Sequence, residues 1–321
     1  MQVTNKMVDK QLRMKGRIYS LIARSPSEAK FRRNQKMTSK VFSGRKTKGL
    51  LCGEEWISRT KDSTMLRIRV YKPLIPKENV PGILWIHGGG YAIGAPEMST
   101  GMYKNLIAES NCVIVALDYR LSVEAPYPAA LEDCYEALLW MKNHAKELGI
   151  RENQLMVGGE SAGGGLVAAL TLYARDKGEV NIAFQMPLYP MIDDRMTSES
   201  AKENNAPVWN SQSNEVAWKL YLGELYGKDV PAYAAAARAT DYSNLPPTVT
   251  FVGDLEPFRD ETIQYVDNLR KAGVPVDFEL YKGCYHGFDI MNTKADVTKK
   301  AISFLMNSFR YAVKNYYAEQ K

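Results

Sequence analysis

The 321-residue chain has an ordinary apolar fraction of 45%, four cysteines and a net charge of +6, which suits one large α/β domain or two small ones. It contains no run of the roughly 18 apolar residues that a membrane-spanning helix needs, and its N-terminus lacks the apolar core of a secretory signal. The cysteines are scattered without a CxxC pair, which indicates buried thiols rather than disulfides or zinc. Together these features predict a cytoplasmic protein.

The first 50 residues carry most of the positive charge. They hold 14 Lys and Arg against Asp9 and Glu28, a net of +12, so the rest of the chain is at −6. Such an arm can bind nucleic acid or an anionic membrane, but no aromatic-and-basic nucleic-acid motif accompanies it. Four apolar residues recur instead at the spacing of a solvated amphipathic helix: Met14, Ile18, Leu21 and Ile22. We therefore expect no nucleic-acid partner and no stable membrane association.

From about residue 51 the pattern predicts strands that alternate with helices. Residues 51–60 and 64–72 read as an opening hairpin. The later expected strands are mostly short apolar runs, typical of strands buried on both faces: 83–86, 112–117, 155–157, 183–188, 249–252 and 276–281. Helical segments lie between most of them, as in 131–148 and 261–271. The alternation predicts an α/β fold with a mostly parallel central sheet and helices on both faces.

Residues 191–240 break this rhythm, because they are polar at first and then helical around 216–225. An insertion between two strands of such a sheet commonly lies over the carboxyl ends of the strands, where ligands bind. We therefore expect residues 1–50 and 191–240 to form a cap. The core would then consist of residues 51–190 and 241–321.

A glycine-rich turn, GGESAGGG, occupies residues 158–165 between a strand-like and a helix-like run. A phosphate-binding loop would need Lys and then Ser or Thr where Gly165-Leu166 stands. A dinucleotide-binding turn would need its first glycine directly after the strand, whereas Gly163 comes later. The GxSxG interpretation fits, because it puts Ser161 at a strained strand-to-helix turn with its hydroxyl projecting from the sheet. Ser161 is therefore the candidate nucleophile.

A serine hydroxyl needs a base, and the chain has only three histidines. His144 lies in a charged helical stretch. In hydrolases with this turn the chain order is nucleophile, acid, histidine, and His286 is the one histidine that follows Ser161. His286 is therefore the candidate base.

The segment His87–Gly90 (HGGG) follows the expected strand 83–86. Acyl transfer builds negative charge on the carbonyl oxygen, which preorganised backbone N–H groups stabilise. Glycines let the backbone approach the substrate without a Cβ in the way. We expect the N–H groups of Gly88, Gly89 and Ala162 to form this oxyanion hole.

With these residues the chain resembles the hormone-sensitive lipase family of α/β-hydrolases, the bacterial family IV carboxylesterases. The resemblance runs from about residue 80 to the C-terminus. It rests on seven segments in order: HGGG 87–90, DYRL 118–121, PYPAA 126–130, GESAGG 159–164, ATD 239–241, EPFRD 256–260 and HGF 286–288. It implies an α/β-hydrolase fold with a helical cap, and a Ser–acid–His carboxylesterase.

Two positions depart from the family pattern. Glu160 stands before the nucleophile where Asp is usual, and Glu256 stands where the catalytic acid is usually Asp. The second departure leaves the acid open between Glu256 and Asp254. The family register, with the acid before a proline and four residues before an Asp, favours Glu256.

The resulting hypothesis is a serine carboxylesterase for short acyl esters, with Ser161, Glu256 and His286 as its triad. His87 and Glu160 would support these groups, and no metal or organic cofactor is needed. The expected partner is a small-molecule ester, and a homodimer stays open. Fold and triad fix the reaction class but not the substrate. A non-catalytic ligand receptor, a membrane-surface lipase and a peptidase or amidase therefore remain as alternatives.

Overall fold

An eight-stranded sheet in the order β1-β2-β4-β3-β5-β6-β7-β8 forms the centre of the computed structural model, which describes residues 1–22 and 25–320. The hairpin strands β1 (Leu51–Ser58) and β2 (Met65–Lys72) are antiparallel, as is β2 with β4 (Val113–Leu117). The other strands pair in parallel: β3 (Val80–Ile86), β5 (Ile150–Glu160), β6 (Phe184–Leu188), β7 (Thr248–Gly253) and β8 (Val276–Tyr281). The prediction of a mostly parallel sheet is confirmed.

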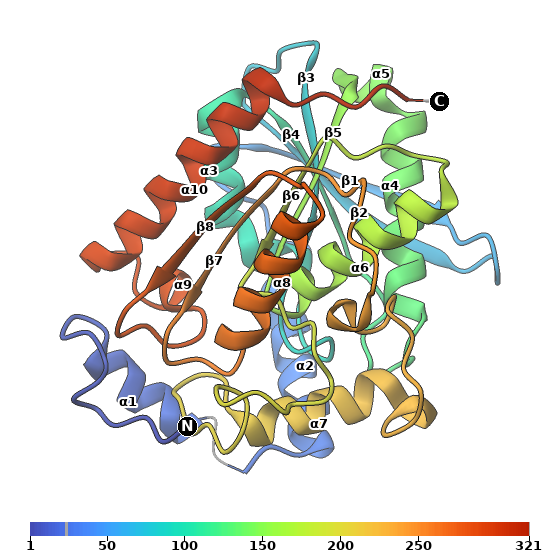
Figure 1. Ribbon diagram of the computed structural model, residues 1–321. Coiled ribbons are helices and arrows are strands. Elements are labelled where there is room, and N and C mark those ends of the chain that lie inside the picture. Colours follow the sequence, from blue (N-terminus) through green and yellow to red (C-terminus); the bar gives the residue numbers. More distant parts are fainter. Residues whose placement is uncertain (23–24, 321) are drawn as a thin grey trace.

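Helices cover both faces of this sheet (Figure 1). One face carries α4 (Ala129–Asn143), α6 (Ala162–Lys177) and α8 (Arg259–Lys271). The other face carries α3 (Thr100–Ser110) and α10 (Asp296–Asn315). Side chains alternate between these layers along β3, so Leu84 packs toward the first set and Trp85 toward the second.

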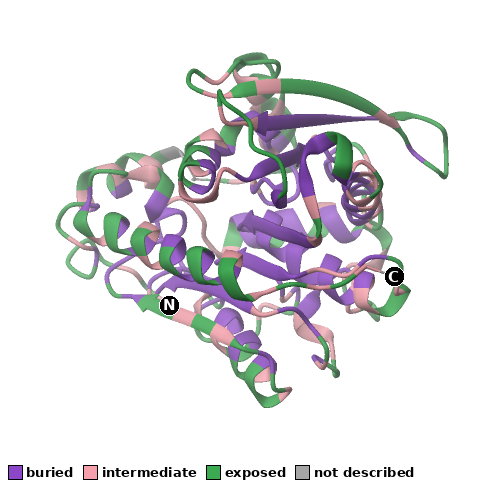
Figure 2. Ribbon diagram, turned by 90° about the horizontal axis from the view of Figure 1, so that it is seen from above, coloured by how far each residue is buried: buried purple, intermediate pink, exposed green. Residues whose placement is uncertain are grey.

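Burial follows this layering (Figure 2). Strands β3 and β4 are buried along their whole length, which explains their continuous apolar sequences. Strand β1 is the edge of the sheet and is mostly exposed.

Several elements differ in extent from the sequence prediction, and three of these differences have a clear structural reason. Strand β5 is longer than expected because it pairs with both β3 and β6. The expected helix 131–148 is divided at His144 into α4 and α5 (Ala145–Leu148). Helix α7 (Ser211–Leu222) begins earlier than expected because the Asn210 side chain caps it, accepting from Ser213 N at 2.9 Å.

The helices of the two segments expected to form the cap lie together at the carboxyl ends of the parallel strands. Helices α1 (Arg13–Ile22), α2 (Glu28–Phe42) and α7 lie along this end of the molecule (Figure 1). The rings of Phe31 and Trp209 join the two segments with centroids 6.2 Å apart. The Met1 ammonium also donates to the carbonyl oxygens of Glu199 and Lys202.

The expected amphipathic helix is present as α1, but its apolar stripe faces solvent. Met14, Ile18 and Leu21 are 72%, 53% and 60% exposed, and the side chain of Ile22 lies outside the described part of the chain. Across residues 1–22 and 25–320, no helix combines the length and apolar character needed to cross a membrane.

Candidate active site

Ser161 occupies a strained turn between β5 and α6. Its φ of 59° and ψ of −120° lie in a region that non-glycine residues rarely adopt. The flanking glycines are sterically required, because a Cβ on Gly159 or Gly163 would lie 2.5 Å or 2.1 Å from Ile86 O. Ser161 N donates to Leu188 O at 3.0 Å, which ties the turn to the end of β6. The turn therefore holds the serine side chain at the carboxyl edge of the sheet.

His286 faces Ser161 from the loop after β8. Its Nε2 lies 2.8 Å from Ser161 Oγ, within hydrogen-bonding distance. The imidazole packs edge-on against Tyr189 and Phe258, each with ring centroids 5.1 Å away. These contacts fix the ring plane, so the Nε2 lone pair can accept the serine proton.

The two candidate acids have different partners. Glu256 Oε2 lies 2.5 Å from His286 Nδ1, and its Oε1 accepts from Gly253 N at 2.9 Å. Asp254 Oδ1 instead accepts from Gly283 N at 2.7 Å, and burial raises the pKa of this carboxyl. Glu256 is fully buried and contacts His286. Asp254 instead holds the turn at Gly283, which precedes His286 in the chain.

The glycine loop after β3 offers backbone donors near Ser161. Gly88 N donates to Glu160 Oε1 at 3.3 Å, so this group, expected in the oxyanion hole, is engaged within the protein. The N–H groups of Gly89, Gly90 and Ala162 have no hydrogen-bond partner among the described residues. Gly89 adopts a φ of +120°, and a Cβ there would lie 1.8 Å from Ile93 O. The loop conformation therefore requires glycine and leaves these donors free.

Glu160, the residue before Ser161, accepts hydrogen bonds from three donors. Besides Gly88 N, it accepts from Trp85 Nε1 at 2.7 Å and from Ser99 Oγ at 2.5 Å. Burial raises the pKa of this carboxyl, and the three hydrogen bonds oppose that shift. Glu160 thus connects the nucleophile turn to the glycine loop.

His87 has a supporting position. Its ring stacks on Tyr119 with centroids 4.4 Å apart, and its Nδ1 lies 2.8 Å from Gly88 O. Tyr119 also donates from its hydroxyl to His87 O at 3.0 Å. Burial lowers the pKa of His87, which favours the neutral ring.

A small pocket of 210 Å³ lies above the catalytic groups, between α2 and the start of α7. Its walls include Phe31, Ile93 and Trp209. The Trp209 ring lies 6.2 Å from the His286 ring, so the pocket adjoins the base. Because Trp209 lies between this pocket and His286, we call it the approach pocket.

Three residues of the site have no role predicted from the sequence. Ser99, Tyr119 and Phe258 approach the catalytic groups from separate elements. Nothing in the local pattern around Ser99 distinguishes it from other polar positions, and Tyr119 lies in the family segment DYRL without an evident role.

The chain is similar in sequence to known hydrolases and esterases. The family model described as an alpha/beta hydrolase fold matches residues 83–290. The chain is 33% identical to esterase LipI of Mycobacterium tuberculosis, covering 68% of this chain and 70% of that protein. It is 31% identical to an arylesterase of Saccharolobus solfataricus, covering 70% and 72%.

A solved structure extends the similarity over almost the whole chain. A bacterial heroin esterase superposes with a TM-score of 0.88 at 33% identity, covering 97% of this chain and 99% of that one. The similarity includes the helices at the carboxyl end of the sheet as well as the sheet itself.

Proposed function

The chain belongs to the alpha/beta-hydrolase family of hormone-sensitive lipase type and is a carboxylic ester hydrolase, and we propose that it cleaves short-chain acyl esters through Ser161, His286 and Glu256. One observation carries the proposal: Ser161 Oγ lies 2.8 Å from His286 Nε2 at a strained turn. This is the pairing that turns a weakly nucleophilic hydroxyl into an attacking group.

In the first half-reaction Ser161 attacks the ester carbonyl while His286 Nε2 takes its proton. Glu256, as the acid of the triad, accepts the Nδ1–H of His286 and stabilises the imidazolium. Support for this role comes from its 2.5 Å contact and complete burial. The protonated histidine then donates to the leaving alcohol, and water hydrolyses the acyl-enzyme with His286 as base.

We assign the oxyanion hole to the N–H groups of Gly89, Gly90 and Ala162. Their lack of protein partners supports this assignment, because unpaired donors beside a nucleophile are free to bind developing negative charge. Ala162 N is the first N–H of α6, which has no intrahelical partner. Gly88 has a different task in this proposal: its bond to Glu160 fixes the loop.

The preference for short acyl groups is supported by the space above the site. The approach pocket measures 210 Å³ and is bounded by Trp209 and Phe31. Ser161 itself is only 6% exposed. Long flexible chains would have to displace these aromatic side chains.

Residues 1–50 and 191–240 act as a cap in this proposal. The arm is tied to the core by hydrogen bonds from Tyr285 Oη to Leu12 O at 3.2 Å and from Gly44 N to Glu97 Oε1 at 2.8 Å. Gln35 also exchanges two hydrogen bonds with Gly94, at 2.8 and 3.1 Å. These contacts support a covering role for the arm.

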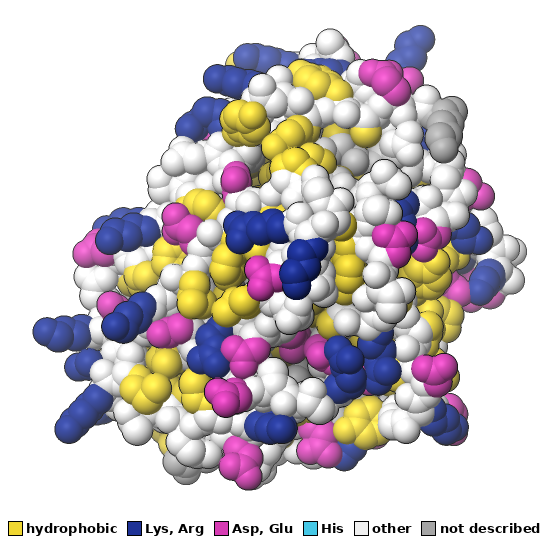
Figure 3. All heavy atoms as spheres, viewed as in Figure 1, with side chains coloured by type: hydrophobic (Ala, Val, Ile, Leu, Met, Phe, Trp, Pro, Cys, Tyr) yellow, Lys and Arg dark blue, Asp and Glu magenta, His cyan; other side chains and the backbone are white. Residues whose placement is uncertain are grey.

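We further propose that the arm does not bind membranes stably. On the face shown in Figure 3, Lys and Arg are interspersed with Asp and Glu rather than gathered in one patch. Binding to anionic vesicles should be weak and should vanish at physiological salt. The exposed Met14, Ile18 and Leu21 are the residues that a lipid surface would contact. Tight vesicle binding at that salt, lost in a triple Ser variant, would instead identify a surface lipase.

Covalent labelling tests the catalytic proposal directly. A fluorophosphonate should label the protein once, at Ser161, and mass spectrometry of the digested protein locates the adduct. A panel of p-nitrophenyl esters should show kcat/KM falling as the acyl chain lengthens. Labelling that persists in Ser161→Ala would remove the serine mechanism, and a preference for long chains would remove the short-chain assignment.

A further inference from the structure

A separate cavity of 560 Å³ lies beside the nucleophile turn, between α3, α9 (Phe288–Met291) and α10. Much of its wall is apolar, from Trp85, Met102, Leu188 and Ile302. It does not share the residues of the approach pocket under α2. The cavity is therefore a distinct space, large enough for a group of several carbon atoms.

Two buried carboxyl groups also line this cavity. Glu160 is 8% exposed and Asp289 is 3% exposed. Among the described residues no Lys or Arg forms an ion pair with either of them; Lys299, at the rim, pairs with Asp296 at 3.1 Å. Buried charges are normally paired, so two acids without a basic partner are unusual for a purely structural wall.

The two carboxyl groups are bound differently. Glu160 accepts three hydrogen bonds, which suits an ionised carboxylate. Asp289 Oδ2 accepts from Tyr189 Oη at 3.2 Å, whereas its Oδ1 is buried and has no hydrogen-bond partner among the described residues. One carboxyl oxygen of a residue that lines the cavity is therefore left without a donor by the described residues.

The cavity shares its wall with the catalytic groups. Tyr189 lines it, bonds Asp289, and packs its ring 5.1 Å from the ring of His286. Leu188, also in the wall, accepts from Ser161 N at 3.0 Å. The cavity therefore adjoins the catalytic residues through Leu188 and Tyr189.

We propose that the cavity is a subsite for a cationic arm of the substrate, an alkylammonium group on an apolar chain, with Asp289 as its counter-ion. The apolar wall would cover the methylene and methyl groups, and the carboxylates would balance the charge. A neutral arm would leave both acids unpaired, and an anionic arm would be repelled. The inference rests on the proposed function, because it takes Ser161 as the nucleophile.

The ionisation of Asp289 supports a dependence of this preference on pH. Burial raises the pKa of Asp289 to about 7, and the Tyr189 hydrogen bond opposes that shift. The charged or titratable groups around it are Glu160 from β5, Tyr189 after β6, His286 after β8 and Lys299 on α10. Since a cation favours the ionised form, selectivity for it should rise as pH increases through about 7.

Matched ester pairs that differ only in charge test the subsite. For the alcohol arm the pair is acetylcholine and 3,3-dimethylbutyl acetate. For the acyl arm it is the phenyl esters of 4-(trimethylammonio)butanoate and 5,5-dimethylhexanoate. For at least one arm, the wild-type ratio of kcat/KM, cationic over neutral, should be about 10 or more at pH 8.

Asp289→Asn should lower that ratio by about 10- to 100-fold, the range for loss of a charged hydrogen bond. Asp267→Asn, the same change at an exposed position on α8, is the control and should leave the ratio as it is. A ratio compares two substrates on one enzyme, so partial misfolding of a variant cancels. The wild-type ratio should also rise between pH 6 and 8, a test that needs no variant.

A ratio near one for both arms in the wild type would overturn the subsite, as would an unchanged ratio in Asp289→Asn. Hydrolysis of the neutral esters through Ser161 with such a ratio would leave the proposed function standing. Failure of the wild type to hydrolyse any of the four esters would count against the proposed function itself.

Discussion

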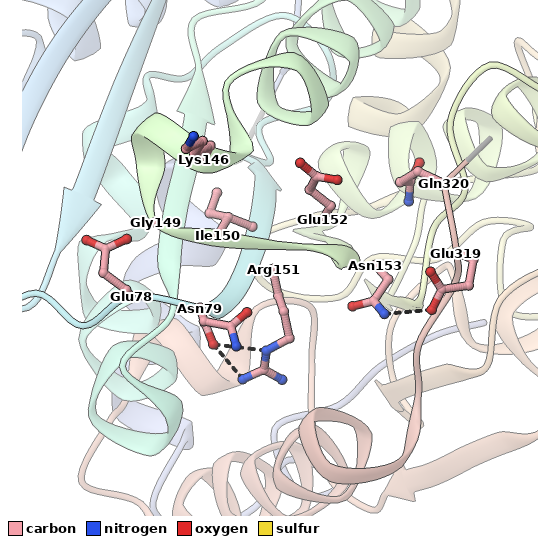
Figure 4. A pocket seen from close by; sticks show the side chains of 10 residues that line it. All are labelled: Glu78, Asn79, Lys146, Gly149, Ile150, Arg151, Glu152, Asn153, Glu319 and Gln320. Carbon is pink, nitrogen blue, oxygen red and sulfur yellow. Dashed lines mark hydrogen bonds between the residues drawn. The ribbon is translucent and has the colours of Figure 1, made fainter.

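The two ends of the sheet differ in whether their polar groups have hydrogen-bond partners within the protein. A hollow lies at the amino ends of the strands, and the active site lies at the carboxyl ends. The hollow at the amino ends of β3 and β5, 500 Å³ in volume, is lined by charged and amide side chains, some of which are hydrogen-bonded within the hollow (Figure 4). There Arg151 donates to Asn79 O at 2.8 and 2.9 Å, and Asn153 donates to Glu319 at 2.7 Å. At the carboxyl ends, the N–H groups of Gly89, Gly90 and Ala162 have no such partner within the described residues.

The two ends of the sheet also differ in which residues adopt a positive φ. The amino-end hollow has positive φ at Gly149 (75°) and at Asn79 (57°), and both residue types adopt this conformation at low cost. The catalytic end places non-glycine residues at positive φ, among them Ser161 at 59° and Tyr189 at 34°. Satisfied groups and relaxed turns stabilise a fold, whereas free donors and strained turns mark the end that binds a reacting molecule.

Removing the nucleophile should have the largest effect. Ser161→Ala should lower kcat for p-nitrophenyl acetate by about 10⁶-fold, as loss of a triad serine does elsewhere. The melting temperature should not fall, because the change removes no packing. A loss of less than 10-fold would show that the strained turn is not the reacting centre.

The two acids beside β7 should differ widely. Glu256→Gln should lower kcat by about 10⁴-fold, because the carboxylate that fixes the histidine tautomer is lost. Asp254→Asn, which alters a hydrogen bond to Gly283, should cost less than about 10-fold. Steady-state kinetics with circular dichroism on both variants checks this ranking, and the reverse ranking would make Asp254 the catalytic acid.

Displacing the backbone N–H groups of the glycine loop should lower the rate of ester hydrolysis by an intermediate amount. Gly89→Ala puts a Cβ where Ile93 O lies, so the loop must move and the donors lose their aim. The rate should fall about 10²- to 10³-fold, the range for a lost oxyanion donor. Gly53→Ala on the edge strand β1 is the control, since its Cβ would meet Val70 at an ordinary 3.8 Å. Equal rates for the two variants would contradict the oxyanion assignment.

The burial of Asp289 near the active site should make the melting temperature of the protein depend on pH. The pKa of Asp289 is about 7 in the folded protein, above its ordinary value of 3.8. Its stabilising contribution is therefore complete below about pH 4 and is lost as the pH rises through about 7. The melting temperature of Asp289→Asn minus that of wild type should increase across this range. A constant difference would mean that Asp289 titrates normally.

The smallest effect belongs to the amino-end hollow. Arg151→Met should lower the free energy of unfolding by about 1 kcal/mol through lost hydrogen bonds. It should leave kcat/KM within about two-fold, because the hollow lies at the far end of the strands. Urea titration and ester kinetics measure the two quantities, and a large loss of activity would break the contrast between the two ends of the sheet.

The sequence by itself determined the elements whose reasons are local. The alternation of buried strands and helices required a mostly parallel sheet, because only such strands are apolar throughout. Gly159 and Gly163 must be glycine because a Cβ at either position would clash with the backbone oxygen of Ile86 in β3. The GxSxG motif therefore predicts the close packing of the Ser161 turn on β3. The order of Ser161 and His286 then led to the pair that lies 2.8 Å apart.

The tertiary structure decided everything that depends on approach from distant elements. The register of residues 256–260 favours Glu256 as the acid, but the contacts of Glu256 with His286 and of Asp254 with Gly283 depend on how the loop after β8 packs. No local pattern reveals that Glu160 occupies the N–H of Gly88. The same holds for the apolar stripe of α1, whose spacing predicts a helix but not which face contacts the core. The periodicity of a sequence shows how side chains repeat along one helix or strand. Which residues contact one another across elements depends on how those elements pack.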